Sequence, residues 1–346
     1  MIYFHNDYNR SCHVAVMNKL QATLSSPMPG YGTDAMCESA ASKIRKMCEN
    51  NDLSVHFLMG GTQTNMTVIA AALRPHQAVI AADSAHIHVH ETGAVEATGH
   101  KILTIPSLDG KITAQQVETL ALQFIQDENR EHTVQPKMVY ISNSTEWGTI
   151  YSLAELEALS AVCKKHGLYL FMDGARLGYA LSAADNDVTM KDLARLTDVF
   201  YIGGTKQGAL FGEAVVISNP FLAEDFRYII KQHGGMLAKG WLLGLQFDAL
   251  LEDGLYFKLA QQADDLADQI RKILLEFGFQ LYLPSATNQV FAVVEDAFLP
   301  RLREGITFTA MGRIDSKHTI VRLCTSWATE QADVDMLKDF LMNFWV

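Results

Sequence analysis

The chain has 346 residues and a formal net charge of -11, with 49% hydrophobic and 19% charged residues. This composition suits a globular protein with a large core, and the acidic balance argues against a nucleic-acid partner, because phosphate backbones require a basic surface. The five cysteines form no C-x-x-C pair, and no apolar run approaches the length of a membrane span. Because the first residues also lack the features of a signal peptide, we expect a cytoplasmic protein without a membrane segment.

Apolar runs typical of buried strands alternate with helical patterns through the first two thirds of the chain. The expected strands cover Val55–Met59, Ala78–Ala81, Ile102–Ile105, Met138–Ile141, Leu168–Met172, Val199–Ile202 and Ala214–Ile217. The expected helices cover Asn65–Leu73, Ala114–Gln126, Leu153–Lys165 and Lys191–Leu196. This alternation predicts an α/β fold with a mostly parallel, seven-stranded sheet covered by helices on both faces. Only a short turn precedes the last strand, which is therefore expected to run antiparallel to the strand before it.

Beyond about residue 220 the pattern changes to longer helices and short strands. The expected helices cover Phe221–Gln232 and Lys239–Asp253, the second continuing past Gly254 towards Glu276. The expected strands cover Gln289–Val294 and Thr319–Cys324, and a final helix runs from Thr329 to about Phe344. These elements predict a small C-terminal α+β domain. We place the boundary within the long helix, with a large domain over residues 1–245 and a small domain over 246–346.

Asp173 and Lys206 each follow an expected strand of the sheet. Because ligands of open α/β sheets bind at the carboxyl ends of the strands, we expect both side chains in one site. An enzyme that uses pyridoxal phosphate needs this pair: the lysine amine forms a Schiff base with the cofactor aldehyde, and the carboxylate keeps the pyridine nitrogen protonated. Either residue alone is more often a turn or surface residue, but their order and placement together favour the cofactor site.

Two further segments bear on the same chemistry. A strand ends in Gly60-Gly61 and a helix begins near Thr62, which suits a phosphate group, although an ordinary turn with Thr62 as N-cap is the alternative. His86, His88 and His90 alternate, but no cysteine or H-E-x-x-H motif supports a metal, so we expect no metal site. One functional histidine is favoured instead, because an imidazole can stack on the pyridoxal ring and also relay protons.

Two arginines could bind the carboxylate of an amino-acid substrate, because a guanidinium grips a carboxylate with two parallel hydrogen bonds. Arg176 lies three residues after Asp173, and Arg322 lies in the expected strand Thr319–Cys324 of the small domain. A surface position is the alternative for Arg322.

Taken together, the chain resembles the threonine aldolases of the aromatic amino acid β-eliminating lyase/threonine aldolase family, which are pyridoxal phosphate enzymes of fold type I. The resembling stretches are Gly30-Tyr31-Gly32-Thr33-Asp34, Gly61-Thr62-Gln63-Thr64-Asn65, His86 with Glu91-Thr92-Gly93-Ala94, Asp173-Gly174-Ala175-Arg176, Thr205-Lys206 and Val321-Arg322-Leu323. The resemblance implies a fold with a large cofactor-binding domain and a small C-terminal domain, and a homotetramer whose active sites are shared between subunits.

The resemblance also implies the role of each site residue. Lys206 forms the Schiff base, Asp173 pairs with the pyridine nitrogen and His86 stacks on the ring. Gly61 and Thr62 hold the phosphate. The substrate carboxylate is bound by Arg176 and Arg322, and Tyr31 lines the site from a neighbouring subunit.

The chain departs from the family pattern at positions that bear on the reaction. Asn6 stands where the family commonly has a serine near the substrate carboxylate, and Glu146 stands where it has a second active-site histidine. Glu146 is therefore a candidate base towards the substrate β-hydroxyl. The reaction implied is retro-aldol cleavage of L-threonine, L-allo-threonine or a similar β-hydroxy amino acid to glycine and an aldehyde. The alternatives are β-elimination from another amino acid and a cofactor-binding protein without turnover.

Overall fold

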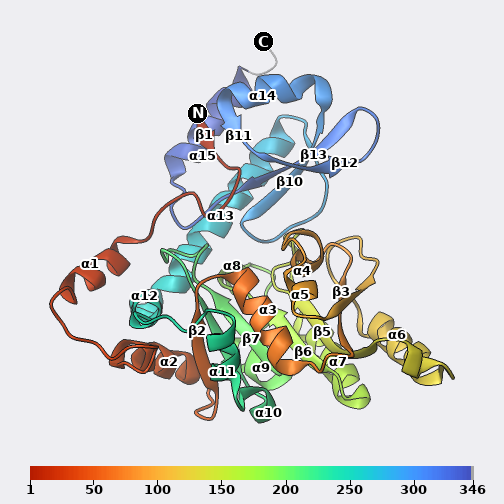
Figure 1. Cartoon of the computed structure of the whole chain (residues 1–346). Helices are drawn as coiled ribbons and strands as arrows, with labels where there is room; N and C mark the ends of the chain where they lie inside the picture. Colours follow the sequence, from red (N-terminus) through yellow and green to blue (C-terminus); the bar gives the residue numbers. More distant parts are fainter. Residues whose placement is uncertain (344–346) are drawn as a thin grey trace.

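A seven-stranded sheet forms the centre of the larger part of the molecule in this computed structural model, which describes residues 1–343 (Figure 1). The strands, in spatial order, are β2 (Ser54–Leu58), β8 (Glu213–Ile217), β7 (Val199–Gly203), β6 (Tyr169–Asp173), β5 (Gln135–Ser142), β3 (Gln77–Ala82) and β4 (Lys101–Ile105). Only β8 runs antiparallel to its neighbours, and all other pairs are parallel. The predicted α/β class and mostly parallel sheet are confirmed, as is the antiparallel β7–β8 pair.

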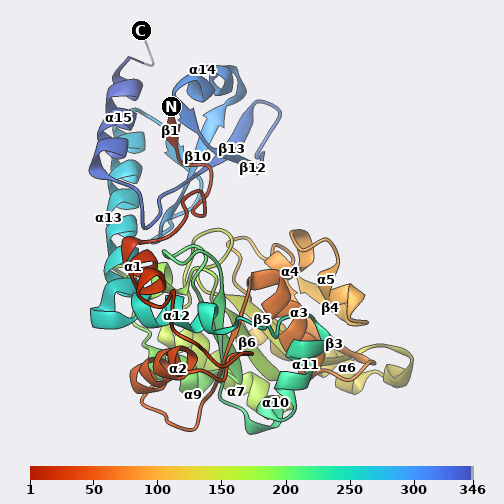
Figure 2. The ribbon, with the colours of Figure 1, turned by 60° about the vertical axis from the view of Figure 1, so that its left-hand side comes forward.

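Helices enclose this sheet, as Figures 1 and 2 show. They are α1 (Val14–Ala22), α2 (Ala35–Met47), α3 (Gly61–Ala72), α4 (His86–Val89), α5 (Ala94–Ala97), α6 (Ala114–Gln126), α7 (Leu153–His166), α8 (Leu177–Ser182), α9 (Met190–Leu196), α10 (Pro220–Ala223), α11 (Phe226–Gln232) and α12 (Trp241–Leu250). Strands β3, β7 and β8 are buried along their whole length. Such continuous apolar runs are what a sheet covered on both faces requires, because alternate side chains point to opposite faces.

The smaller part of the molecule is built on a four-stranded antiparallel sheet. Its strands, in spatial order, are β12 (Thr309–Arg313), β13 (His318–Cys324), β10 (Gln289–Glu295) and β9 (Gln280–Leu281). The helices packed with it are α13 (Leu255–Glu276), α14 (Leu299–Gly305) and α15 (Gln331–Met342). The predicted small α+β part is thus confirmed. The expected end of the last helix at Phe344 lies outside the described residues.

The N-terminus joins this smaller part rather than the larger one. Strand β1 (Ile2–Tyr3) pairs in parallel with β11 (Ile306–Thr307), and the side chains of Ile2 and Phe4 are buried in the same hydrophobic cluster as α13 and α15. The chain then descends to α1 and α2 on the larger part (Figure 1). The residues that follow β1 therefore lead from the smaller part of the molecule to the larger part.

Two helices that the sequence predicts as continuous are broken. The stretch expected from Lys239 to Glu276 is divided into α12 and α13 by Asp253 and Gly254, whose φ angles are 49° and 69°. The stretch Phe221–Gln232 is divided into α10 and α11 by Asp225, at φ 57°. Glycine and aspartate enter the left-handed region more readily than most residues, so they end one helix and start the next although the apolar pattern continues across them.

No helix within residues 1–343 is both long and apolar enough to cross a membrane.

Candidate active site

A cavity of about 340 Å³ lies at the carboxyl ends of the parallel strands. It brings together most of the site residues that the sequence predicts, namely Gly61, Thr62, His86, Glu146, Asp173, Arg176 and Lys206. They come from the ends of β6 and β7, the segment after β5 and the starts of α3 and α4, so a single sheet edge collects side chains that are far apart in the sequence. Tyr8, Ser142, Ser144, Tyr201, Thr205 and Glu213 also line it.

Asp173 is the last residue of β6 and is held as a buried anion. Its Oδ1 accepts a hydrogen bond from the Ala175 N–H at 2.9 Å, and its Oδ2 accepts from Asn65 Nδ2 at 3.1 Å and from the Tyr140 hydroxyl. Burial alone would raise the pKa of Asp173, but these hydrogen bonds, with that of Tyr140 foremost, hold it below its ordinary value. Within residues 1–343 no cation forms an ion pair with this carboxylate. A buried anion of this kind fits a protonated pyridine nitrogen as its partner.

Lys206 is half-buried in a loop that hydrogen bonds hold at both ends. The N–H groups of Gly204 and Thr205 donate to the carbonyl of Gly212 at 2.9 and 3.2 Å, and the Tyr179 hydroxyl donates to the Lys206 carbonyl at 2.6 Å. Burial and the nearby Arg176 guanidinium lower the pKa of Lys206. A lowered pKa favours the unprotonated amine, which is the form that attaches an aldehyde.

The start of α3 forms the cradle expected for a phosphate. Helix α3 begins at Gly61, and its N-cap residue Gly60 supplies no side chain to the free N–H groups of the first turn. The structure therefore excludes Thr62 as the N-cap. A Cβ atom at Gly61 would stand 3.2 Å from the Tyr201 hydroxyl, so glycine keeps this approach open. Unsatisfied N–H groups at a helix start bind a phosphate without further cations.

His86 is held by a chain of buried polar groups. Its Nδ1 lies 2.8 Å from Glu91 Oε1, and Glu91 also accepts from Asn65 Nδ2 at 2.7 Å. Because Asn65 donates to Asp173 as well, one amide connects the histidine's carboxylate partner to the carboxylate of the cofactor site. The segment is the short helix α4 rather than an extended strand, so the three alternating histidines do not share a face, and only His86 lines the cavity.

Glu146 lies in the cavity next to His86. Its Oε1 accepts a hydrogen bond from the His86 backbone N–H at 3.0 Å and from the Ser142 hydroxyl at 2.8 Å. Burial raises the pKa of Glu146 above its ordinary value. Glu146 thus stands on the same sheet edge as Asp173 and Lys206.

Arg176 forms a buried ion pair with a residue that the sequence did not single out. Its Nε and Nη2 donate to the two carboxylate oxygens of Asp7 at 2.7 and 3.1 Å. Asp7 also accepts from Asn288 Nδ2 at 2.9 Å, and although its burial opposes the charge, Arg176 and nearby Lys206 hold the pKa of Asp7 well below its usual range. Asp7 therefore occupies one edge of the Arg176 guanidinium, which fixes the direction in which its remaining N–H groups point.

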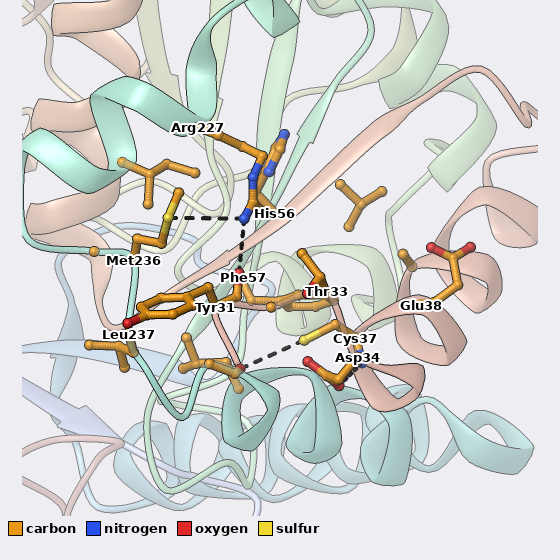
Figure 3. A pocket seen from close by; sticks show the side chains of 17 residues that line it. Tyr31, Thr33, Asp34, Cys37, Glu38, His56, Phe57, Arg227, Met236 and Leu237 are labelled. Atoms are coloured by element: carbon orange, nitrogen blue, oxygen red, sulfur yellow. Dashed lines mark hydrogen bonds between the residues drawn. The ribbon is translucent and has the colours of Figure 1, made fainter. Parts of the chain in front are cut away.

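Three predicted residues lie outside the lining of this cavity. Asn6 accepts from the backbone N–H of Tyr8, which does line it, at 3.1 Å. Arg322 is half-buried on β13 and donates to Gln289 Oε1 at 3.2 Å. Tyr31 lines a separate cavity of about 280 Å³, in which Arg227 donates to the Tyr31 carbonyl at 3.0 Å (Figure 3).

Several residues of the site were not predicted to have a role in it, although the sequence carries a signal for some of them. Glu91 follows His86 by five residues, and Asn65 lies in the first turns of the expected phosphate helix. Glu213 is the one charged residue at the start of an otherwise apolar strand, a placement that in a buried sheet calls for a partner. Asp7 has no such local signal, because its partner lies 169 residues away in the sequence.

Comparison with known proteins places the chain in a family. The sequence profile named Beta-eliminating lyase matches residues 12–297. The chain belongs to this family. It is 34% identical over 314 residues to a low specificity L-threonine aldolase of Pseudomonas sp. (strain NCIMB 10558), covering 88% of this chain and 86% of that protein. A Pseudomonas aeruginosa protein of the same name is 32% identical over 276 residues, covering 79% of this chain and 78% of that protein.

Similarity to solved structures supports this family assignment. The threonine aldolase of Leishmania major superposes with a TM-score of 0.97 at 44% identity, covering 100% of both chains. A Thermus thermophilus aspartate aminotransferase matches with a TM-score of 0.72 at 15% identity, covering 99% of this chain and 91% of that chain, which shows that the fold is shared. This member of the beta-eliminating lyase family is therefore a pyridoxal phosphate-dependent carbon–carbon lyase of fold type I. The cradle at Gly61, the anionic Asp173 and the half-buried Lys206 fit that cofactor.

Proposed function

We propose that the chain cleaves the Cα–Cβ bond of L-threonine, L-allo-threonine or a similar β-hydroxy amino acid, releasing glycine and an aldehyde. The observation that carries this proposal is the cavity in which Lys206, Asp173 and the pair His86 and Glu146 meet. The names of the relatives from Pseudomonas and Leishmania support the substrate class.

The cofactor would be held by residues of four separate segments. Lys206 would bind its aldehyde carbon, Asp173 would keep a proton on its ring nitrogen, and Gly61 and Thr62 would hold its phosphate. His86 would stack on the ring, with the Glu91 carboxylate fixing the imidazole. When bound, pyridoxal phosphate supplies an acceptor for the electron pair released from the Cα–Cβ bond.

The base for the β-hydroxyl proton would be Glu146, directly or through one water, in a role shared with His86. Glu146 faces the cavity, and its raised pKa brings it closer to the pH at which a general base works best. His86 uses Nδ1 towards Glu91, which leaves Nε2 for exchange with substrate. The proton leaves the hydroxyl oxygen as the carbonyl of the aldehyde forms.

Arg176 and Arg322 would bind the substrate carboxylate, with Asn6 near it. Asp7 occupies Nε and Nη2 of Arg176 and so orients its remaining N–H groups. Fixing the carboxylate determines which bond at Cα stands perpendicular to the cofactor ring, and that bond is the one broken.

The active unit would be a homotetramer with shared sites. Tyr31 lies outside the cavity of its own chain and is 47% exposed, so it is available to line the site of a neighbouring subunit. We also propose a cytoplasmic location and the division into domains over residues 1–245 and 246–346.

A second candidate reaction is β-elimination from another amino acid, because the matching family is described by that activity. The scaffold and cofactor would be the same, and only the bases and pocket shape would differ. Glycine as product indicates aldol cleavage, whereas a 2-oxo acid with ammonia indicates elimination.

Reduction with borohydride tests the proposed cofactor site. The purified, cofactor-loaded chain is reduced and digested, and the modified peptide is identified by mass spectrometry. The modification is expected on Lys206, and Lys206→Ala is expected to lose the visible absorption of the bound cofactor. Modification of a different lysine would contradict the assignment.

A further inference from the structure

Glu213 is a buried carboxyl group that the proposed reaction does not use. It is the first residue of β8, directly opposite Gly203 of β7 and Leu58 of β2, and only 3% of it is exposed. It lines the same cavity as Lys206 and Asp173. A glutamate at such a position is rare unless a partner stabilises it.

The carboxylate of Glu213 is bound by neutral donors from the segment that precedes Lys206. Its Oε2 accepts from the Gly204 N–H at 3.1 Å and its Oε1 from the Thr205 hydroxyl at 2.9 Å. Thr205 in turn accepts from the Gly212 N–H at 3.1 Å. Neither oxygen forms an ion pair in the described part of the chain, and Lys206, the residue after Thr205, lines the same cavity as Glu213.

The charged groups around Glu213 influence the protonation of its carboxyl group. Lys206 is the cation that favours its ionised form, and the Asp173 carboxylate opposes it. Two buried phenols lie near it: Tyr201 of β7 lines the same cavity, and the hydroxyl of Tyr256 of α13 donates to the carbonyl of Gly203, the residue paired with Glu213. Burial is the largest influence and raises the pKa of Glu213 to about 8, while burial lowers that of Lys206. Burial thus acts on both groups in the direction of their neutral forms, and each charge favours the other.

We propose that Glu213 is a positioning residue whose carboxylate sets the protonation state of the Lys206 nitrogen in the active site. The interaction acts through space, since no hydrogen bond joins the two side chains among residues 1–343. When Glu213 is ionised it stabilises a proton on that nitrogen, and when it is protonated the nitrogen loses its proton more easily. The inference rests on the proposed role of Lys206 as the residue that binds the cofactor.

The test is a pH titration of the visible absorption of the cofactor-loaded full chain without substrate. In Glu213→Gln the midpoint is expected to move down by about one pH unit, because the stabilising anion is gone. Thr205→Val removes the hydrogen bond that most favours the ionised form of Glu213 but keeps the carboxyl group, so its midpoint is expected to move down by less than that of Glu213→Gln. If Glu213→Gln does not fold, Glu213→Ser supplies a second neutral variant.

The midpoints of the pH titration either support or overturn the proposed role of Glu213. A lower midpoint in Glu213→Gln together with a smaller shift in the same direction in Thr205→Val supports the proposal. Equal midpoints in all three proteins would overturn it, and so would a larger shift in Thr205→Val than in Glu213→Gln, which would show that the hydrogen bonds of the loop, and not the charge of Glu213, set the midpoint. A wild-type chain without the cofactor band would instead contradict the proposed function, so the two failures are distinguishable.

Discussion

In the proposed mechanism, Asp173 is the residue on which the electron-accepting chemistry depends. In Asp173→Asn the amide oxygen can still accept from Asn65 and Tyr140, while the NH2 group replaces the oxygen that accepts from the Ala175 N–H, so the variant is expected to fold with some loss of stability. An amide cannot keep a proton on the pyridine nitrogen, and turnover is expected to fall by several orders of magnitude. The measurement is kcat at saturating cofactor. Near-normal turnover would remove Asp173 from this role.

Glu146 is the proposed base for the β-hydroxyl proton. Glu146→Gln is expected to slow carbon–carbon cleavage at least 10-fold, as loss of a general base does, and to leave the cofactor spectrum and glycine binding unchanged.

The expected pH dependence of turnover follows from the direction in which the pKa of Glu146 is shifted. A base must be ionised to act, so turnover should rise with pH through the pKa of Glu146, which lies above the ordinary glutamate value. This acidic limb is expected to disappear in the glutamine variant. A variant with full activity and the same pH profile would exclude Glu146 as base.

Replacement of Arg322 tests substrate binding separately from cofactor binding. Arg322→Lys keeps the charge but loses the two-bond fork, and KM for amino acids is expected to rise roughly 10-fold or more with little change in cofactor affinity. Arg313→Lys on the exposed strand β12 is the matched control and is expected to change neither. An unchanged KM in Arg322→Lys would return this arginine to a structural role.

The break between α12 and α13 shows how single residues decide the extent of an element. Gly254 has φ 69°, a conformation that costs a residue with a Cβ atom about 1–2 kcal/mol. Gly254→Ala is therefore expected to lower the free energy of unfolding by about 1 kcal/mol or more. Denaturant unfolding measures this, with the exposed Lys258→Ala on α13 as control. Equal stabilities of both variants and the wild type would contradict the strain argument.

The strands and the helix breaks differ in how well the sequence predicts them. The strands of the large sheet were predictable because their apolar runs are continuous and end at glycine or polar residues, as at Asp173 and Gly60. The divisions at Asp253 and Asp225 were not, because the apolar pattern continues across them. A left-handed residue within such a pattern depends on tertiary contacts that no local window contains.

At the scale of the whole molecule, contacts between distant segments escaped prediction. Arg176 was expected at the substrate carboxylate, but its ion pair with Asp7 depends on the path of the N-terminal segment. That path follows from β1 pairing with β11, about 300 residues away. The residues of the sheet edge were predictable from topology, whereas those that hold them, such as Asn65 and Glu213, needed the three-dimensional structure.

Product analysis tests the proposed reaction most directly. The purified, cofactor-loaded chain is incubated separately with each of the four threonine stereoisomers, and glycine, acetaldehyde, 2-oxobutyrate and ammonia are quantified, with Lys206→Ala as control. Equal amounts of glycine and acetaldehyde are expected from at least one L-isomer, and none from the variant. Formation of 2-oxobutyrate and ammonia without glycine, or no turnover of any isomer, would contradict retro-aldol cleavage as the function of this chain.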